Sequence, residues 1–371
     1  MTKEPIGLAI VGSGTVGRIR GELARQYPAV AWLGLCDVKD DIAMKLAEDT
    51  AADYVTNDFE DLISRPEVTA VIVATDENKH VAPVLAAVQA GHDLFIEKPL
   101  ATSAMESKRV LDAIEDAGVD AVVGYTQRFR RRFQAVKGKL AAGQIGDITS
   151  VVTRAFMNRM APLATISKNP VHQNVTPMVI SGTHSLDICM WLMEGKTPVS
   201  VYAESSDRIL GDHGIPDATF GVFTMDDGTI WSMNISWGLP EAWPGAVYGI
   251  EVGIVGTHGV IDIDDTHRDL VLASERPIGH GYNPAGYTPD HQRFVDFMTS
   301  YPPGDLAGGE LWGPMREETM SWFGRIHMGL DTPHATAAEA HRNLILTMSM
   351  DLAAARRTRL DLPVELTEFP A

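Results

Sequence analysis

The sequence is poor in cysteine, in positive charge and in long apolar runs, and each shortage excludes a class of protein. Its 371 residues include only two cysteines, Cys36 and Cys189, which offer no disulfide framework and suit a reducing compartment. The net charge of -18 repels nucleic acid and anionic membrane surfaces. No apolar run reaches the roughly 18 residues that cross a bilayer, and no secretory signal pattern is found. We therefore expect a cytoplasmic protein that binds neither nucleic acid nor membrane.

Several catalytic motifs are missing as well. The 12 histidines are scattered and form no Cys or His pairs at zinc-ligand spacing, so we expect no metal site. A G-x-S-x-G nucleophile elbow and a P-loop lysine are both absent, which argues against hydrolysis through a serine and against phosphoryl transfer. These absences leave the glycine-rich and charged motifs as the candidates for chemistry.

The first third of the chain alternates short apolar runs with helical patterns. Runs rich in β-branched residues predict buried strands over residues 6–11, 30–36, 68–74, 93–96 and 119–123. Helical spacing with a glycine just past the end marks residues 78–90 and 102–117. Strand alternating with helix predicts a doubly wound parallel sheet, a Rossmann domain, over residues 1–125.

The turn after the first predicted strand reads VGSGTVG and fits G-x-G-x-x-G with Gly12, Gly14 and Gly17. These glycines allow a tight turn, a close approach to pyrophosphate and close packing of helix on strand. Asp37 at the end of the second strand would bind ribose hydroxyls and repel a 2′-phosphate, which favours NAD over NADP as the cofactor, although the nearby Lys39 softens that preference. The expected cofactor contacts of this region are Gly12, Ser13, Gly14, Thr15, Val16, Gly17, Asp37 and Val38.

The second part of the chain, residues 126–371, predicts an α+β domain with a large, mostly antiparallel open sheet. Two strand patterns flank Asp226-Asp227-Gly228, and two more flank Thr257-His258-Gly259, so both triplets predict hairpins. In residues 229–237 apolar and polar side chains alternate, which predicts one strongly apolar face. We expect this domain to bind substrate and to form oligomers, with a last helix at about 335–357 that packs back near the first domain.

The stretch FIEKPLAT, residues 95–102, places Lys98 directly after a predicted buried strand. Doubly wound sheets bind ligands at this edge, so the lysine could share a proton with a substrate hydroxyl. The stretch GTHSLDICMWLMEG predicts a helix with Thr183 as its N-cap. His184 and Asp187 are three residues apart and share a face, so the acid could hold the imidazole in one tautomer.

On these motifs the chain resembles the Gfo/Idh/MocA oxidoreductases, related to glucose-fructose oxidoreductase and inositol 2-dehydrogenase. The resemblance rests on the glycine turn, on VIVATDENKHVAPVLAAVQAGHDLFIEKPLATS, on GTHSLDICMWL and on the last helix. It implies that Lys98 and His184 are catalytic, with Asp187 in support, and that the bond before Pro99 is cis. Further cofactor contacts implied on the nicotinamide side are Ala74, Thr75, Asn78, His80, Glu97 and Lys98.

Two positions depart from the family pattern. Asp76 stands where relatives usually carry proline, and Ile180 stands where sugar- and inositol-oxidising relatives usually carry an aspartate, four residues before the histidine. The missing carboxylate favours a less hydroxylated or partly hydrophobic ring. The expected partner is therefore a small cyclic alcohol or ketone, such as a sugar, sugar derivative, inositol or cyclic dihydrodiol.

Some assignments stay open at this stage. Lower-ranked substrate contacts are the strand-end residues Tyr125 and Arg128 and the loop residues Arg159, His172 and Asn174. The aromatic and methionine-rich segment 306–330 could be ordinary core or an added helical pair over the active site or between subunits. By resemblance we expect a homodimer or homotetramer through the C-terminal sheet.

Three functions fit these motifs. The first is an NAD-dependent dehydrogenase or reductase that acts on the CH–OH group of a cyclic polyol-like substrate. The second is an NAD-dependent glycoside-cleaving enzyme, in which transient ring oxidation lets a leaving group depart. The third is a non-enzymatic sensor that uses the cofactor fold as a ligand switch. The presence of both Lys98 and His184 argues against the sensor, which has no need of an acid–base pair.

Overall fold

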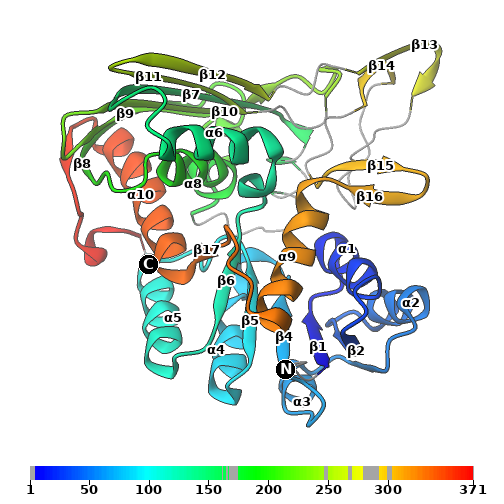
Figure 1. Cartoon of the computed structure of the whole chain (residues 1–371). Helices are drawn as coiled ribbons and strands as arrows, with labels where there is room; N and C mark the ends of the chain where they lie inside the picture. Colours follow the sequence, from blue (N-terminus) through cyan, green and yellow to red (C-terminus); the bar gives the residue numbers. More distant parts are fainter. Residues whose placement is uncertain are drawn as a thin grey trace. The chain divides into compact units, whose positions relative to one another are not determined.

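The computed structural model describes residues 5–160, 162, 163, 166, 174–245, 250–265, 270–278, 292–298 and 303–370. The chain divides into two compact units (Figure 1). The first unit consists of Met1–Phe129 with Pro314–Leu344, and the second of Arg130–Gly313 with Ile345–Pro370. Residues 314–344, which the sequence analysis placed with the second domain, thus belong to the first unit.

The first unit contains a seven-stranded sheet in the order β17-β6-β5-β4-β1-β2-β3. All neighbours are parallel except β17, which pairs antiparallel with β6. The order reverses between β1 and β4, which is where doubly wound sheets bind ligands. The strands are β1 (Ile6–Val11), β2 (Val30–Cys36), β3 (Tyr54–Thr56), β4 (Ala70–Val73), β5 (Asp93–Glu97), β6 (Ala121–Gly124) and β17 (Ala335–Thr336).

Helices pack on both faces of this sheet, because the parallel strands are apolar on both sides. One buried cluster joins the sheet to α3, α4 and α5, and another joins it to α1, α2 and α9. These helices are α1 (Thr15–Ala24), α2 (Asp40–Thr50), α3 (Phe59–Ile63), α4 (Val81–Ala90), α5 (Ala104–Ala117) and α9 (Pro314–Met328), and short 3₁₀ turns cover Glu77–Lys79 and Thr126–Phe129. The Rossmann architecture predicted from the sequence is confirmed.

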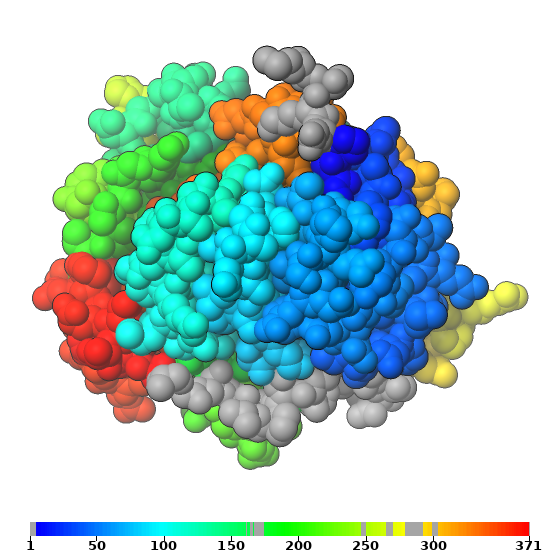
Figure 2. Space-filling view, turned by 90° about the horizontal axis from the view of Figure 1, so that it is seen from below, coloured from blue at the N-terminus to red at the C-terminus, as the bar shows by residue number. Residues whose placement is uncertain are grey.

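Helix α9 answers part of the question left open for segment 306–330, because it buries Met315, Trp322 and Phe323 in the core. Trp312, before the helix, and Met328, at its end, are more than half exposed. Trp322 and Phe323 are fully buried with strand residues such as Phe95, whose ring centroid lies 5.5 Å from that of Trp322. Phe323 also contacts Tyr27, which follows α1, at 5.2 Å between ring centroids. In Figure 2 the orange surface of this segment adjoins the blue surface of the N-terminal part.

The second unit contains a seven-stranded sheet in the order β12-β11-β7-β10-β9-β8-β18, in which only β10 and β7 are parallel. The mostly antiparallel sheet and both predicted hairpins are confirmed. The strands are β7 (Ile148–Asn158), β8 (Pro198–Ser206), β9 (Ala218–Met225), β10 (Ile230–Leu239), β11 (Ile250–Gly256), β12 (Gly259–Asp265) and β18 (Leu360–Asp361). Two-stranded sheets join β13 (Val271–Ile278) to β14 (Arg293–Phe297) and β15 (Asp305–Ala307) to β16 (Glu310–Trp312).

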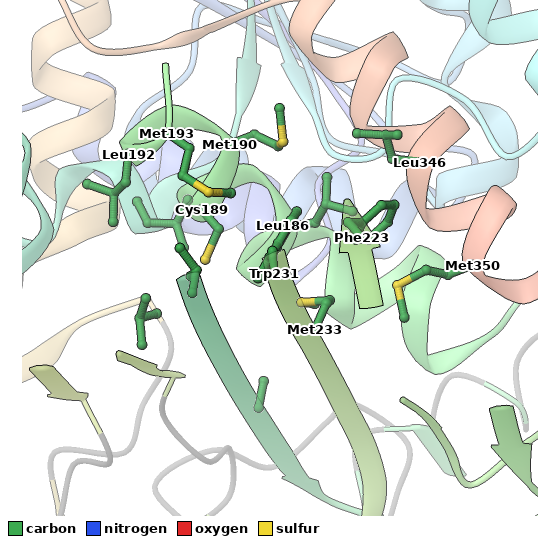
Figure 3. Packing of buried hydrophobic residues seen from close by; sticks show 14 of the residues in the cluster. Leu186, Cys189, Met190, Leu192, Met193, Phe223, Trp231, Met233, Leu346 and Met350 are labelled. Carbon is green, nitrogen blue, oxygen red and sulfur yellow. The ribbon is translucent and has the colours of Figure 1, made fainter. Parts of the chain in front are cut away.

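One face of the large sheet is covered by helices. As the alternation predicted, Trp231, Met233 and Ile235 of β10 are fully buried. Figure 3 shows side chains of α8, of β9 and β10 and of α10 pointing toward one another in this core. The helical segments of the unit include α6 (Arg131–Ala141), a π-helical turn (Pro177–Gly182), α8 (Thr183–Leu192) and the second part of α10 (Ala337–Arg356), with 3₁₀ turns at Gly211–His213 and Leu366–Glu368.

Candidate active site

The turn after β1 has the backbone geometry of a dinucleotide-binding loop. Gly12 has φ +97°, and a Cβ there would lie 2.5 Å from the Ala74 carbonyl oxygen. A Cβ on Gly17 would lie 1.8 Å from the Gly12 carbonyl oxygen, whereas one on Gly14 would meet nothing within 4 Å. Two glycines therefore permit close packing. The third leaves space beside the N-terminus of α1, where free amides attract phosphate, so the turn fits a pyrophosphate.

The carboxylate of Asp37, just after β2, is tied to the glycine turn. Its Oδ2 accepts a hydrogen bond from the Ser13 amide at 2.9 Å, and its Oδ1 accepts one from the Lys39 amide at 2.9 Å. Val38 beside it is 77% exposed. An acid held at this strand end fits a ribose diol. Within α1, Thr15 is exposed and Val16 is half-buried.

His80 joins the segments that follow β4 and β5. Its buried ring places Nδ1 2.8 Å from the Pro99 carbonyl oxygen and Nε2 3.2 Å from the Thr75 carbonyl oxygen. The Lys98–Pro99 peptide bond is cis, as the resemblance predicted. Lys98 itself is half-buried. The imidazole thus ties the backbone beside Lys98 to the segment after β4.

These contacts form a continuous series along one edge of the sheet. Asp37 contacts the glycine turn, the turn lies against the backbone of Ala74 and Thr75, and His80 connects Thr75 to Pro99. Asn78 is exposed in the 3₁₀ turn between these residues. The structure therefore brings the expected cofactor residues of the first unit together at the carboxyl ends of β1, β2, β4 and β5.

Glu97, at the end of β5, belongs to a largely buried group of polar side chains, which we call the Arg20 cluster: Arg20 of α1, Glu97, Glu318 of α9, and Thr126. Arg20 is fully buried and donates to Glu97 Oε1 from Nε at 3.0 Å and from Nη2 at 2.8 Å. The same Nη2 donates to Glu318 Oε2 at 2.6 Å, and this oxygen also accepts from the Thr126 hydroxyl at 3.0 Å. The Arg20 guanidinium thus forms ion pairs with two carboxylates.

Burial dominates the electrostatics of this cluster. It raises the pKa of Glu318 to about 7, against the opposing effect of Arg20 and with a further increase from Glu97. Burial likewise lowers the pKa of His334 to about 3, and its Nε2 lies 3.1 Å from the Glu318 carbonyl oxygen. Glu318 therefore exchanges its proton near neutral pH, while His334 stays neutral there.

Tyr125 and Arg128, predicted as substrate contacts, are both buried in the first unit. Tyr125 is 1% exposed and belongs to the core cluster of α4 and α5. Arg128 is 2% exposed and donates to both carboxylate oxygens of Glu339, at 3.1 and 3.2 Å. Their substrate role remains a prediction.

In the second unit a π-helical turn leads into the helix that carries His184. The Thr176 hydroxyl caps this turn by accepting from the Val179 amide at 3.1 Å, and it donates to Asp351 Oδ2 at 2.5 Å. The predicted N-cap role of Thr183 is wrong: Gly182 before it is already helical, and α8 continues the π-helical turn without a break. The helical segment therefore begins one and a half turns or so earlier, at Pro177.

The catalytic candidates of this unit lie on that segment. His184 is half-buried, Asp187 is fully buried, and Ile180 is 8% exposed one helical turn before His184. The Trp237 indole donates to the Ser181 hydroxyl at 2.9 Å and anchors the turn to β10. His184 and Lys98 belong to different units, and their convergence on one substrate carbon remains a prediction.

The structure describes two of the three loop residues predicted as substrate contacts, Arg159 and Asn174. Arg159 donates from its side chain to the carbonyl oxygens of Leu239, at 3.2 Å, and Gly238, at 3.0 Å, at the end of β10. Asn174 is half-buried with φ +59°. His172 lies outside the described residues.

Thiol, metal and membrane features can be stated for the described part of the chain. Burial raises the pKa of the Cys36 and Cys189 thiols to about 12, so neither thiol is a nucleophile near neutral pH. The described residues hold no cluster of three or more potential metal ligands. Among the helices described, none is long and apolar enough to span a bilayer.

Sequence reasoning missed Arg20, Glu318 and Asp351. Arg20 stands four residues after Val16 and three before Leu23, on the predicted apolar face of its helix. Glu318 likewise stands between Met315 and Trp322 on an apolar stripe. A charge at core spacing was the available signal, because such a charge must find a partner when the helix packs.

Comparisons with known proteins agree with this architecture. The Gfo/Idh/MocA oxidoreductase family, NAD-binding Rossmann fold, matches residues 6–125, and the GFO/IDH/MocA C-terminal domain matches residues 133–262. An inositol 2-dehydrogenase of Gluconacetobacter diazotrophicus is 32% identical over 326 residues, which cover 83% of this chain and 89% of that protein.

Solved structures show the same fold at lower identity. Scyllo-inositol dehydrogenase from Lactobacillus casei, with bound NAD(H) and scyllo-inositol, has a TM-score of 0.77 and 19% identity, and covers 96% of this chain and 99% of its own. GenD2 from gentamicin A biosynthesis, in complex with NAD, has a TM-score of 0.76 and 18% identity, with 98% of each chain covered. From its motifs, its fold and its relatives, the chain belongs to the Gfo/Idh/MocA family of oxidoreductases with an NAD(P)-binding Rossmann domain.

Proposed function

We propose that this oxidoreductase is an NAD-dependent dehydrogenase or reductase that interconverts a secondary alcohol and a ketone on a cyclic, polyol-like substrate. The observation that carries the proposal is the series of contacts from Asp37 through the glycine turn and His80 to Pro99. It sets Lys98 at the same sheet edge as the dinucleotide motif. A relative named inositol 2-dehydrogenase supports a ring substrate with several hydroxyls.

The residues at this edge fit the cofactor. The open side of Gly14 and the amides of α1 would hold the pyrophosphate, and Asp37 would hold the adenine-side ribose. Ala74 and Thr75 would lie on the nicotinamide side, with Glu97 and Lys98 beside that ribose. When bound, the nicotinamide would exchange a hydride with the substrate carbon.

The acid–base work falls to Lys98 and His184. In oxidation, His184 would take the hydroxyl proton as the hydride leaves the same carbon, and Lys98 would stabilise the oxygen and share its proton. Asp187, three residues after His184 in α8, would hold the imidazole orientation. In reduction the same two groups would return the proton to the carbonyl oxygen.

The test measures turnover and cofactor state together. We expect the wild type to accumulate NADH in proportion to the alcohol consumed, and Lys98→Ala and His184→Ala each to lower turnover by roughly 100-fold or more. NAD affinity should change little in either variant. Wild-type turnover in either variant would remove the mechanism. Release of an aglycone without net NADH would instead support glycoside cleavage, and cofactor binding without any turnover would support a sensor.

Ile180 favours a ring that is less hydroxylated than inositol. It lies one helical turn before His184 and supplies no carboxylate to orient a substrate hydroxyl. A panel of myo-inositol, glucose, cyclic diols and deoxygenated analogues should therefore give its highest kcat/KM on a diol or deoxygenated ring. Ile180→Asp should move the preference toward inositols. Higher efficiency of the wild type on myo-inositol or glucose would rule this specificity out.

The cofactor preference follows from Asp37. Its carboxylate is fixed at the end of β2 by two backbone amides, where it would repel a 2′-phosphate. We expect kcat/KM with NAD to exceed that with NADP, and Asp37→Ser to narrow the ratio by about tenfold, on the scale of one lost charge interaction. An unchanged ratio would assign the preference to other residues.

The uncovered face of the C-terminal sheet suits a second copy of this chain. Val152, Tyr202, Phe220 and Val222 are each at least 41% exposed there, and Phe220 stacks on Phe156 at 6.1 Å between ring centroids. Exposed apolar area of this kind is typical of interfaces. We propose a homodimer or homotetramer through this face, and Val222→Glu should lower the mass measured by light scattering. A monomeric wild type would contradict the assembly.

A further inference from the structure

We propose that Arg20 and Glu318 are positioning residues that hold the Glu97-Lys98-Pro99 segment through the carboxylate of Glu97, and that the charge of Glu318 is part of this role. The inference rests on the proposed function, because it concerns the same lysine. It adds a residue of α9, more than 200 positions away in sequence, to the machinery around Lys98.

The first support is the complete use of the Arg20 side chain. Its five N–H groups match five contacts. Two go to Glu97 and one to Glu318, and Nη1 donates to the Thr319 hydroxyl at 2.5 Å and to the Met315 carbonyl oxygen at 3.4 Å. The guanidinium also stacks over the Phe95 ring at 4.2 Å from its centroid. A planar group held at every donor fixes the direction of the carboxylates it contacts.

The second support is the position of Glu97. Its Oε1 takes both hydrogen bonds from Arg20, while its side chain is 12% exposed. A Cβ on Gly124 of the neighbouring strand would lie 2.9 Å from Oε2, so the glycine leaves the space that this carboxylate occupies against the strand. Glu97 is followed directly by Lys98, and a displaced carboxylate would therefore move or re-orient the lysine backbone.

The third support is the charge of the cluster. With both carboxylates ionised it carries one net negative charge, and with Glu318 protonated it carries none. Because the pKa of Glu318 is about 7, this change falls in the neutral range. The groups facing Glu318 are Arg20, Glu97, Thr126 and His334, with the Arg128–Glu339 pair further along. Burial lowers the pKa of His334 to about 3, so His334 stays neutral throughout this range.

Glu318→Gln tests the charge with little change of shape. The glutamine amide can still accept from Arg20 and contact Thr126, so the variant resembles wild type with Glu318 protonated. We expect the ratio of kcat/KM between variant and wild type to stay near one at pH 5.5. At pH 8.5 this ratio should differ from one by at least about threefold, which is a modest effect for one charge in a partly desolvated site. A purely structural role gives a ratio that does not depend on pH.

Asp120→Asn is the matched control. The Asp120 carboxylate accepts three hydrogen bonds from Arg325, which is also on α9, at 2.8, 2.9 and 3.1 Å. It precedes β6, so it lies at the edge of the sheet opposite Lys98. The ratio of kcat/KM between Asp120→Asn and wild type should therefore be the same at pH 5.5 and pH 8.5.

Thr126→Val is the second variant. It removes the hydroxyl that favours ionised Glu318, so the inflection in the pH profile of kcat/KM should move to higher pH.

A readout without turnover separates this inference from the proposed function. The dissociation constant of NADH, measured by fluorescence titration, should show the same pH-dependent ratio for Glu318→Gln, because Glu97 is expected beside the nicotinamide ribose. If no alcohol is turned over by wild type, the proposed function falls and NADH binding decides the inference. A pH-independent ratio in both measurements, or an equal change in Asp120→Asn, would overturn it.

Discussion

Two carboxyl groups, fully buried Glu318 in the first unit and half-buried Asp351 in the second, have a pKa raised to the same value for different reasons. Glu318 in the first unit faces a guanidinium, and Asp351 in the second faces the hydroxyls of Thr176 and Thr219. Burial raises the pKa of each to about 7. For Glu318, the charge of Arg20 lowers the pKa against the effect of burial, while the nearby carboxylate of Glu97 raises it further. For Asp351, only hydrogen bonds from two hydroxyls lower the pKa against the effect of burial.

The difference shows that the same pKa can mark two kinds of site. Ionised Glu318 remains compensated by Arg20, so its proton changes the charge of a cluster that stays assembled. Ionised Asp351 has no cation among its described contacts, so its negative charge is a cost to folding. Changes at Arg20 and at Asp351 should therefore act in opposite directions at alkaline pH.

The largest effect is expected from Arg20→Leu. It would leave Glu97 and Glu318 buried without their cation, and breaking a buried pair in this way costs about 3–5 kcal/mol. The loss in the free energy of unfolding, measured with urea, should be greatest at pH 8.5. It should be smaller at pH 5.5, where Glu318 holds a proton.

Arg325→Leu provides the comparison within the same helix. Arg325 and Asp120 are each about a third exposed, so water replaces the lost contact, and the cost should be about 1 kcal/mol or less. Equal losses in the two variants would show that burial of the Arg20 cluster contributes nothing to its strength.

A smaller effect of opposite sign is expected from Asp351→Asn. The pKa of folded Asp351, about 7, lies above the ordinary aspartate value of 3.8, so the folded state binds more protons between these pH values. Stability from this group is complete below about pH 4 and is lost as pH rises through 7. Asparagine can keep both threonine contacts without charge. We expect a gain of about 2 kcal/mol at pH 8.5 and less than half of that at pH 5.

Glu318→Gln provides a comparison for Asp351→Asn, because in the wild type Arg20 already compensates the negative charge of Glu318. Its gain in stability at pH 8.5 should be smaller than that of Asp351→Asn. Urea unfolding at the two pH values measures both variants. A gain for Asp351→Asn that is the same at pH 5 and pH 8.5 would contradict the assignment of the raised pKa to burial.

The sequence predicted the local features of the fold well. The Asp226-Asp227-Gly228 turn fixes its hairpin because Gly228 adopts φ +86° beside strands of clear alternation. The Rossmann strands are equally local, as apolar runs between turn signals. Strand β3 was missed because its three residues are too short to show a period.

The buried charges could not be predicted in the same way. Arg20 and Glu318 are 298 positions apart, and no local pattern pairs a charge on one helix with a charge on another. The boundary between the two units at residue 314 could not be predicted for the same reason. Helix α9 joins the first unit because Trp322 packs against Phe95, which is far away in the sequence. The cap of the His184 segment did carry a signal, since Thr176-Pro177 is a typical helix start.

That cap supplies the last and smallest prediction. Thr176 accepts from the Val179 amide and donates to Asp351, so Thr176→Val would remove one helix cap and one hydroxyl that opposes the raised pKa of Asp351. The expected cost is about 1 kcal/mol, larger at pH 8.5 than at pH 5.5. Thr176→Ser keeps the hydroxyl and should restore both the stability and its pH dependence.

Thr176→Val should also affect turnover. Since the π-helical turn leads directly to His184, kcat of this variant should fall by a larger factor than its affinity for NADH. A Thr176→Val protein with unchanged kcat and unchanged pH dependence would show that this turn is held by the Trp237–Ser181 contact alone.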